Sequence, residues 1–240
     1  MEGMFRDYTE EAAALMQKAD AGDAEAQYHF ATYLLREPDN SYRKDLTPDE
    51  VERGIHYLQL SAAQGYFYGM AADDLGRIYF DGVIVQKDYK KAKMWFLTAE
   101  MKGIPTATYM LGECAYFGYD EDVSYEKAAM CYLKAAPRYI NAVMRLGDMY
   151  VHGEYLPLDT AFAKELYEHV CVSEDWYHKK TGVYSDAYEM VLQRLREIEN
   201  AGSLIQPVRM DETEEQVNVR KALLEIMEDE KKRWQKWGDE

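Results

Sequence analysis

Histidine and cysteine are the residues of this sequence that could bind a metal or form a nucleophile with its base. The five histidines and three cysteines are His29, His56, His152, His169, His178, Cys114, Cys131 and Cys171. No histidine lies in an H-E-x-x-H pattern, and no Cys/His spacing matches a zinc site. Glu165 and His169 are four residues apart, which favours an ordinary contact on one helix face. We therefore predict no metal site and no cofactor.

A cysteine activated by a histidine is the remaining catalytic arrangement, because the two members of such a pair meet only in the fold. Under this interpretation Cys171 is the candidate nucleophile of a hydrolase. The cysteines, however, fall on or beside predicted helix faces, where a buried thiol behaves as a small apolar residue. The sequence also has no G-x-S-x-G, Walker or G-x-G-x-x-G motif. We therefore predict no catalytic residues and a protein that is not an enzyme, with the hydrolase as the weaker alternative.

The composition is that of an acidic chain that favours helices. In 240 residues, 28 Lys plus Arg stand against 44 Asp plus Glu, so the formal net charge is −16. This charge argues against binding to nucleic acid or to an anionic membrane surface. Many alanines, with 21 Tyr and only 6 Pro, favour helices. The start resembles neither a signal nor a transit peptide, the three cysteines form no disulfide framework, and no apolar run could span a membrane. We expect a cytoplasmic protein.

The elements that must position any site repeat along the chain. Leu-Gly pairs occur at Leu75-Gly76, Leu111-Gly112 and Leu146-Gly147, with spacings of 36 and 35 residues. Each pair begins a similar segment, LGRIYFDG, LGECAYFG or LGDMYVHG, that closes on Gly82, Gly118 or Gly153. Glycine at this place is typical of the residue that follows a helix and turns the chain.

A second block follows each of these glycines. The blocks DYKKAKMWFLTAEMKG, SYEKAAMCYLKAA and DTAFAKELYEHV begin at Asp88, Ser124 and Asp159, which are good N-cap residues. Each unit is therefore predicted to be a helix, a Gly turn and a second helix in about 36 residues. A degenerate first copy starts with AGDAEAQYHFATYLL at Ala21. Its second helix is predicted to start at the capping box formed by Thr47 and Glu50.

These motifs resemble the Sel1-like repeat family, a relative of the tetratricopeptide repeat, over about residues 20–172. The matching features are A-G-x-A-x-A-Q at residues 21–27, the three L-G-x-x-x-x-x-G segments, and the D-Y-K-K-A and S-Y-E-K-A starts. The resemblance implies an all-α, right-handed α/α superhelix of helix-turn-helix repeats. We place the repeats at about 21–65, 66–103, 104–138 and 139–172, with a degenerate pair from 183. Gly and Ala should let paired helices approach closely.

The two ends should differ from the repeats, since terminal elements of a solenoid face solvent. We predict a capping helix over residues 7–19. Residues 173–182 should form a polar, aromatic insertion, and residues 184–200 another helix. Residues 1–202 then form the solenoid, and 203–240 a linker and a capping helix from about residue 211 to 237 that packs on it. The alternative is a detachable helix that docks in a partner or in the chain's own groove.

The resemblance also implies that the first helix of each pair lines a concave face. The candidate partner-binding residues beside the Leu-Gly positions are expected to be exposed, and they are His29, Thr32, Asp74, Arg77, Met110, Glu113, Arg145 and Asp148. Trp176 and Tyr177 in the predicted insertion are further candidates, because aromatic residues are enriched at binding hot spots. Packing against the end of the solenoid is the alternative role for these two.

These observations favour a protein–protein interaction scaffold that binds a protein or peptide in its concave groove. The negative charge indicates a partner that is basic at least locally. We expect a monomer or a weak homodimer. The alternative is a bacterial immunity or inhibitor protein that neutralises a cognate toxin or enzyme.

Overall fold

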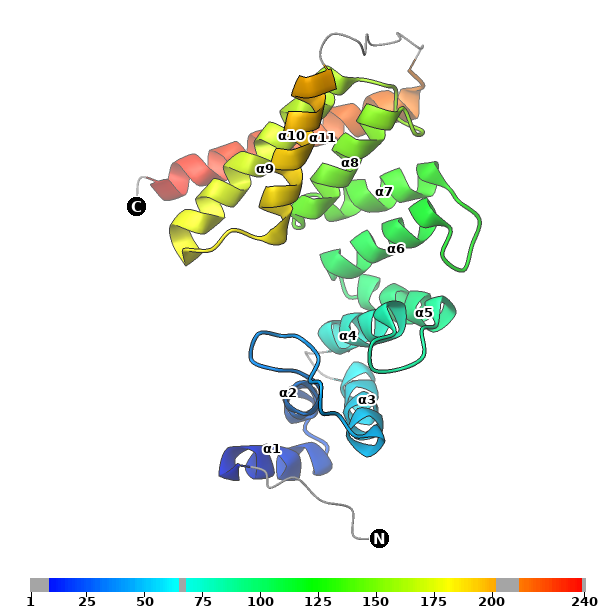
Figure 1. Ribbon diagram of the computed structural model, residues 1–240, viewed down its shortest axis with the longest axis vertical. Coiled ribbons are helices and arrows are strands. Elements are labelled where there is room, and N and C mark those ends of the chain that lie inside the picture. The colour runs from blue at the N-terminus through cyan, green and yellow to red at the C-terminus, as the bar shows by residue number, and fades with distance from the viewer. Residues whose placement is uncertain (1–8, 65–67, 202–211, 239–240) are drawn as a thin grey trace. The chain divides into compact units, whose positions relative to one another are not determined.

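A computed structural model describes residues 9–64, 68–201 and 212–238 of the chain, and within them it shows eleven helices and no strand. The all-α prediction is therefore confirmed. In chain order the helices are α1 (Glu10–Asp20), α2 (Ala24–Leu35), α3 (Pro48–Ala62), α4 (Tyr68–Asp81), α5 (Tyr89–Glu100), α6 (Pro105–Phe117), α7 (Tyr125–Ala135), α8 (Ile140–His152), α9 (Thr160–Thr181), α10 (Asp186–Ala201) and α11 (Glu214–Gly238) (Figure 1).

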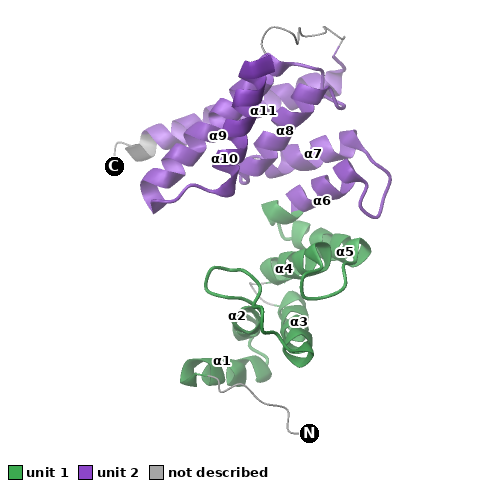
Figure 2. Ribbon diagram, in the orientation of Figure 1, with its two compact units in different colours: residues 1–107 green, residues 108–240 purple. Residues whose placement is uncertain are grey.

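The chain forms two compact units, residues 1–107 and residues 108–240 (Figure 2). In unit 1, α2 packs against α1 and α3, and α4 packs against α3 and α5. In unit 2, α8 packs against α7 and α9, and α10 packs mainly against α9. These helices thus pack against their neighbours along the chain, as expected when stacked repeats bury one another's apolar faces.

The predicted helix starts are confirmed. The side chains of Asp88, Ser124 and Asp159 each accept a hydrogen bond from the backbone N–H three residues later. The backbone N–H of each of these caps also donates to a carbonyl nine residues earlier, at 2.8–2.9 Å, so the three turns are built alike. Thr47 and Glu50 form the predicted capping box at the start of α3. These bonds satisfy backbone groups that a helix end would otherwise leave without partners.

The glycines that close the first helix of each repeat have the predicted conformation. Gly82, Gly118 and Gly153 have φ angles of 65°, 71° and 67°, in the left-handed region. At the end of α8, the Gly153 N–H donates to the carbonyl of Met149. Glycine is favoured here because a Cβ atom makes this backbone conformation costly.

The glycines of the Leu-Gly pairs serve close packing instead. A Cβ added to Gly112 of α6 would lie 2.5 Å from Cε1 of Tyr132 in α7. A Cβ added to Gly147 of α8 would lie 2.5 Å from Cε1 of Tyr167 in α9. Real carbon atoms do not approach so closely, so only glycine lets each ring pack onto the backbone of the facing helix. The predicted close approach of paired helices is confirmed.

The predicted insertion at residues 173–182 is wrong, because α9 continues through it to Thr181. Buried Glu174 gives the physical reason. Its carboxylate accepts hydrogen bonds from the backbone N–H of Ser185 at 2.9 Å and from its hydroxyl at 2.8 Å, just before α10 begins. The added turns of α9 thus hold the start of the next helix, a tertiary contact that the local polarity of the segment does not indicate.

The predicted terminal helices are present with shifted bounds. Thr9 caps α1, which starts at Glu10, and α10 starts at Asp186. Asp7, Tyr8 and the connector predicted at residues 203–210 lie outside the described residues.

Helix α11 packs on the other helices of unit 2. Val219, Leu223 and Met227 are buried on one of its faces. Arg220 Nη2 lies 2.6 Å from Asp159 Oδ2, and its guanidinium carbon lies 4.4 Å from the centroid of the Phe162 ring. Arg220 therefore covers the residue that caps α9, and α11 forms one side of unit 2.

Candidate functional site

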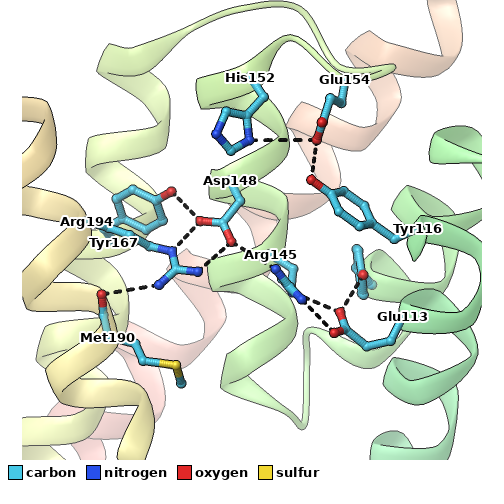
Figure 3. A network of polar contacts seen from close by, with 10 residues as sticks. Glu113, Tyr116, Arg145, Asp148, His152, Glu154, Tyr167, Met190 and Arg194 are labelled. Atoms are coloured by element: carbon cyan, nitrogen blue, oxygen red, sulfur yellow. Dashed lines mark hydrogen bonds and ion pairs between the residues drawn. The ribbon is translucent and has the colours of Figure 1, made fainter.

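Helices α6 and α8 bring three of the predicted binding residues together. Glu113 and Asp148 each lie two residues after the leucine of a Leu-Gly pair, so the repeat gives them equivalent positions on successive first helices. Arg145 lies about one turn before Asp148 in α8. Figure 3 shows the Arg145 guanidinium between the carboxylates of Glu113 and Asp148.

The charged groups of this site form a continuous chain, which we call the ion-pair network: Glu113, Arg145, Asp148 and Arg194. Arg145 Nε and Nη2 donate to the two oxygens of Glu113 at 2.8 and 2.6 Å. Its Nη1 reaches Asp148 Oδ2 at 3.5 Å. From α10, Arg194 Nη2 donates to the same oxygen at 2.9 Å, and its Nε donates to Asp148 Oδ1. Two carboxylates face two guanidinium groups, so the charges within the network cancel.

Two tyrosines complete the network with the same geometry in successive repeats. The Tyr132 hydroxyl donates to Glu113 Oε1 at 2.6 Å, and the Tyr167 hydroxyl donates to Asp148 Oδ1 at 2.7 Å. Burial, and then the neighbouring carboxylate, raises the pKa of both hydroxyls above its ordinary value. Both hydroxyls therefore stay protonated and act as hydrogen-bond donors at neutral pH.

The corresponding repeat of unit 1 lacks this pairing. Its aromatic residue is Phe96, which has no hydroxyl, and Arg77 stands where Glu113 and Asp148 stand in the later repeats. A bond from a tyrosine of the second helix to a carboxylate two residues after the leucine of the Leu-Gly pair is thus present in the repeats of α6/α7 and α8/α9 and not in that of α4/α5.

Not every predicted binding residue has the exposure that we expected. Asp148 and Met110 are only 5% and 8% exposed, so the expectation of exposure is wrong for both. Asp148 turns inward because Tyr167 and Arg194 bind its carboxylate. His29 and Tyr177 are exposed, and the remaining candidates are half-buried: Thr32, Asp74, Arg77, Glu113, Arg145 and Trp176.

Four pockets contain seven of these residues, and Thr32 lines one of them, about 500 Å³ in volume, in unit 1. Arg145 and Asp148 line a pocket of about 460 Å³ in unit 2, to which α10 contributes Arg194. Trp176 and Tyr177 line a second pocket of unit 2, about 580 Å³ in volume. In unit 1, Asp74 and Arg77 line a pocket of about 720 Å³. These seven residues thus lie in four separate hollows, two in each unit.

Two observations bear on catalytic chemistry, namely the grouping of possible metal ligands and the state of the Cys171 thiol. Within the described residues, no group of three or more His, Cys, Asp or Glu side chains could hold a metal ion. Burial, and then the charges of Asp175 and Glu168, raises the pKa of Cys171. A raised pKa keeps a thiol protonated and lowers its reactivity as a nucleophile.

No described helix is long and apolar enough to cross a bilayer.

The family model of the Sel1 repeat matches residues 24–66, 69–104, 105–136 and 140–168, which together make up more than half of the chain. The chain belongs to the Sel1 repeat family. The four matches of this Sel1 repeat protein cover the helix pairs α2/α3, α4/α5 and α6/α7, and then α8 with the first part of α9. Trp176, Arg194 and all of α11 lie beyond them.

Solved structures of other Sel1 repeat proteins are similar to this chain. One is a protective antigen of uropathogenic Escherichia coli with an SLR fold, at 26% identity and a TM-score of 0.58 over 80% of this chain and 41% of that chain. Another is a Sel1 repeat protein of Oxalobacter formigenes, at 22% identity and a TM-score of 0.58 over 82% of this chain and 57% of that chain. This chain thus spans less than two thirds of either protein. None of the curated proteins matches it.

Several residues of the network in this Sel1 repeat protein were not among the predicted site residues. Tyr132 and Tyr167 were detectable, because each follows the glycine of its Leu-Gly pair by 20 residues, as Phe96 does. Arg194 had no such signal, since α10 lies outside the matched repeats. Asp73 was also missed, although it lies one helical turn before Arg77 and next to Asp74.

Proposed function

We propose that this Sel1 repeat protein is a non-enzymatic scaffold that holds a protein or peptide partner against its repeat surface, and that the partner is basic at least locally. Sel1 repeat proteins are commonly scaffolds for protein–protein interactions. The formal charge of −16 supports a basic partner, since opposite charges steer association. The raised pKa of the Cys171 thiol supports a binding role rather than a hydrolase.

The observation that carries this proposal is a group of aromatic side chains around the pocket of about 580 Å³ in unit 2. We call this hollow the aromatic pocket. It is lined by Tyr139 before α8, Trp176 and Tyr177 of α9, and Trp234 of α11. Tyr177 is 47% exposed. Aromatic residues that converge on an open pocket are the usual anchors of a protein interface.

Charged residues around the aromatic pocket support a basic partner. Glu174, Asp186 and Glu230 line it together with a single basic residue, Arg138. Ser185 binds Glu174, and Glu230 Oε2 lies 2.7 Å from His169 Nε2, so two of the carboxylates are held in place. The excess of negative charge suits an apolar side chain that has a lysine or arginine beside it.

The test begins with affinity capture from the native host and mass spectrometry, which supply a candidate partner. The purified partner is then titrated against the wild type and the Trp176→Ala/Tyr177→Ala variant. Loss of two anchors should raise the Kd by roughly 30-fold or more. Val172→Ala is the matched control, because Val172 is half exposed on the same helix and does not line the pocket.

The thermal unfolding of each variant shows whether it is folded. A double variant that melts earlier but binds the partner with unchanged affinity would mean that Trp176 and Tyr177 only stabilise the fold. The electrostatic part is tested separately, since a Kd that stays constant from low to high salt contradicts a basic partner.

A further inference from the structure

A pocket of unit 1, lined by a face of α4, has an excess of negative charge that the ion-pair network of unit 2 lacks. Its volume is about 720 Å³. The helix contributes Met70, Asp73, Asp74, Arg77 and Asp81. The last four follow Met70 by three, four, seven and eleven residues, a spacing that places all five side chains on one face of a helix. We call this hollow the acidic pocket.

Other segments of unit 1 complete the walls of the acidic pocket. Helix α2 contributes Tyr28, the residue just after its end is Arg36, and the loop that follows contributes Tyr42. Thr106, at the start of α6, also lines the pocket. Three aspartates therefore face two arginines, and one net negative charge remains.

The existing contacts hold two of the aspartates in fixed positions. Asp73 Oδ2 accepts hydrogen bonds from Arg77 Nε at 3.2 Å and from the Thr106 hydroxyl at 2.8 Å. Asp74 Oδ1 accepts a hydrogen bond from Arg36 Nη2 at 3.0 Å. The carboxylates are thus organised before any partner arrives, which reduces the entropy lost on binding.

Two buried oxygen atoms of the pocket lack hydrogen-bond partners within the described residues. One is Asp73 Oδ1, whose residue is only 9% exposed, and the other is the hydroxyl oxygen of Tyr42. Buried polar atoms of native proteins nearly always have a partner. Asp73 and Tyr42 both line the acidic pocket, and an anionic and a phenolic oxygen without partners suit a cation that carries N–H donors.

The energetics of the aspartates agree with this assignment. Burial raises the pKa of Asp74, with Arg36 opposing the shift, and partial burial raises the pKa of Asp81, with Arg77 opposing it. Burial therefore makes the charged form of each carboxyl less favourable than it is in water, which a bound cation would offset. The guanidinium of Arg36 already lies 4.9 Å from the centroid of the Tyr42 ring, so one wall of the pocket accommodates an organic cation.

We propose that the acidic pocket binds a lysine or arginine side chain of the protein partner. The assignment rests on the proposed scaffold function and identifies where one basic residue of the partner is bound. A carboxylate or phosphate is repelled by the three aspartates. A bare metal ion is disfavoured because no described group of acidic, histidine or cysteine side chains forms a metal site.

The experiment uses the full chain labelled with ¹⁵N and three blocked pentapeptides, Gly-Gly-Arg-Gly-Gly, Gly-Gly-Lys-Gly-Gly and Gly-Gly-Gln-Gly-Gly. We expect the arginine and lysine peptides to shift the amide signals of α4 and of residues 40–42 in a saturable manner. The glutamine peptide should shift none of them. Equal shifts with glutamine, or shifts spread over acidic surfaces of both units, would overturn the proposal.

Two variants locate the binding within the pocket. Asp81→Asn removes a carboxylate that is itself exposed, and Asp73→Asn removes the charge of the unpartnered oxygen with little change in size. Each should weaken binding of the arginine peptide about tenfold, as expected for the loss of one charged hydrogen bond. The control is Asp122→Asn, which removes the same charge from an exposed position of unit 2 and should change nothing.

Circular dichroism is used to check that each variant is folded. If Asp73→Asn does not fold, the peptide affinity of Asp81→Asn alone tests whether the peptide binds in the acidic pocket. Unchanged affinity for the arginine peptide in the folded variants would overturn the proposal that the acidic pocket is its binding site. Weaker peptide binding with unchanged binding of the captured partner overturns its role in partner recognition. Peptide binding retained by Trp176→Ala/Tyr177→Ala shows that the acidic pocket acts independently, whatever becomes of the aromatic pocket.

Discussion

Arg145 binds Glu113 through two hydrogen bonds of 2.8 and 2.6 Å, and this bidentate pair joins α8 to α6. Both side chains are largely buried, and Arg145 also reaches Asp148. A planar guanidinium fits two carboxylate oxygens at once, so the pair fixes the spacing of successive first helices as well as their charges. The network therefore holds the repeats of unit 2 in register.

A double-mutant cycle should show strong coupling between these two residues. Glu113→Gln or Arg145→Gln alone leaves a buried charge without its partner and should lower the free energy of unfolding by about 3 kcal/mol. The double variant should lose less than the sum, with a coupling energy of about 1–3 kcal/mol. Urea denaturation gives the free energy of unfolding of the wild type, the two single variants and the double variant.

The control for the cycle is Glu228→Gln, which breaks the exposed pair of Glu228 with Lys232 on α11. Exposed pairs contribute little, so we expect no measurable change in stability. Additive losses at Glu113 and Arg145 would show that the bidentate geometry does not stabilise unit 2.

The sequence predicts the repeat itself well, because each repeat is specified by local chemistry. The side-chain oxygens of Asp88, Ser124 and Asp159 each accept a hydrogen bond from a backbone N–H in the first turn of the helix that follows. Gly153 adopts a backbone conformation that other residues avoid. Neither effect depends on distant residues. Periodicity and spacing were therefore sufficient for the fold class and for the helix starts at these three caps.

The site was only partly predictable, because its geometry depends on contacts between distant residues. Asp148 was expected at the surface, but Arg194, 46 residues later in a degenerate helix, binds it and helps to bury it. The continuation of α9 through Trp176 depends on the bond from Ser185 to Glu174. Local sequence patterns contain no information about such partners.

The close contact between Gly147 and Tyr167 predicts that even one methyl group will strain unit 2. Gly147→Ala should lower the free energy of unfolding by about 1–3 kcal/mol, because overpacking outweighs the better helix propensity of alanine. The double variant Gly147→Ala/Tyr167→Leu tests the cause. If the ring is the obstacle, the double variant should lose less stability than the two single losses combined, as thermal unfolding will show.

The carboxylate of Asp159 gives unit 2 a dependence on pH. Burial opposes its ionisation, but the Phe162 N–H and the Arg220 guanidinium hold the pKa of Asp159 below its ordinary value. A depressed carboxyl pKa adds stability above the unfolded pKa of about 3.9, and this stability is lost as the pH falls through the folded pKa.

Asp159→Asn keeps a good N-cap but loses the charge, so it should cost about 1 kcal/mol at pH 7. This difference from the wild type should shrink as the pH falls below about 4. Asp159→Ala also loses the cap and should cost about 1 kcal/mol more, a part that persists in acid. Urea denaturation between pH 3 and 7 provides the measurement, and a gap between Asn and wild type that does not depend on pH would contradict the charge effect.

Two adjacent leucines of α11 can show whether this helix is an integral part of unit 2. Leu223 is 0% exposed, whereas Leu224 is 45% exposed. Leu223→Ala should therefore cost about 2–4 kcal/mol and speed hydrogen exchange of the α11 amides, while Leu224→Ala should change neither. If both variants behave as the wild type, or if the wild-type α11 amides already exchange as quickly as those of an isolated helix, α11 is not held on unit 2 and the detachable-helix interpretation is favoured. If hydrogen exchange of the α11 amides becomes fast only in Leu223→Ala, docking of α11 depends on this buried side chain. Arg220 and Glu230, on either side of Leu223 along the helix, add polar contacts to the same docked state.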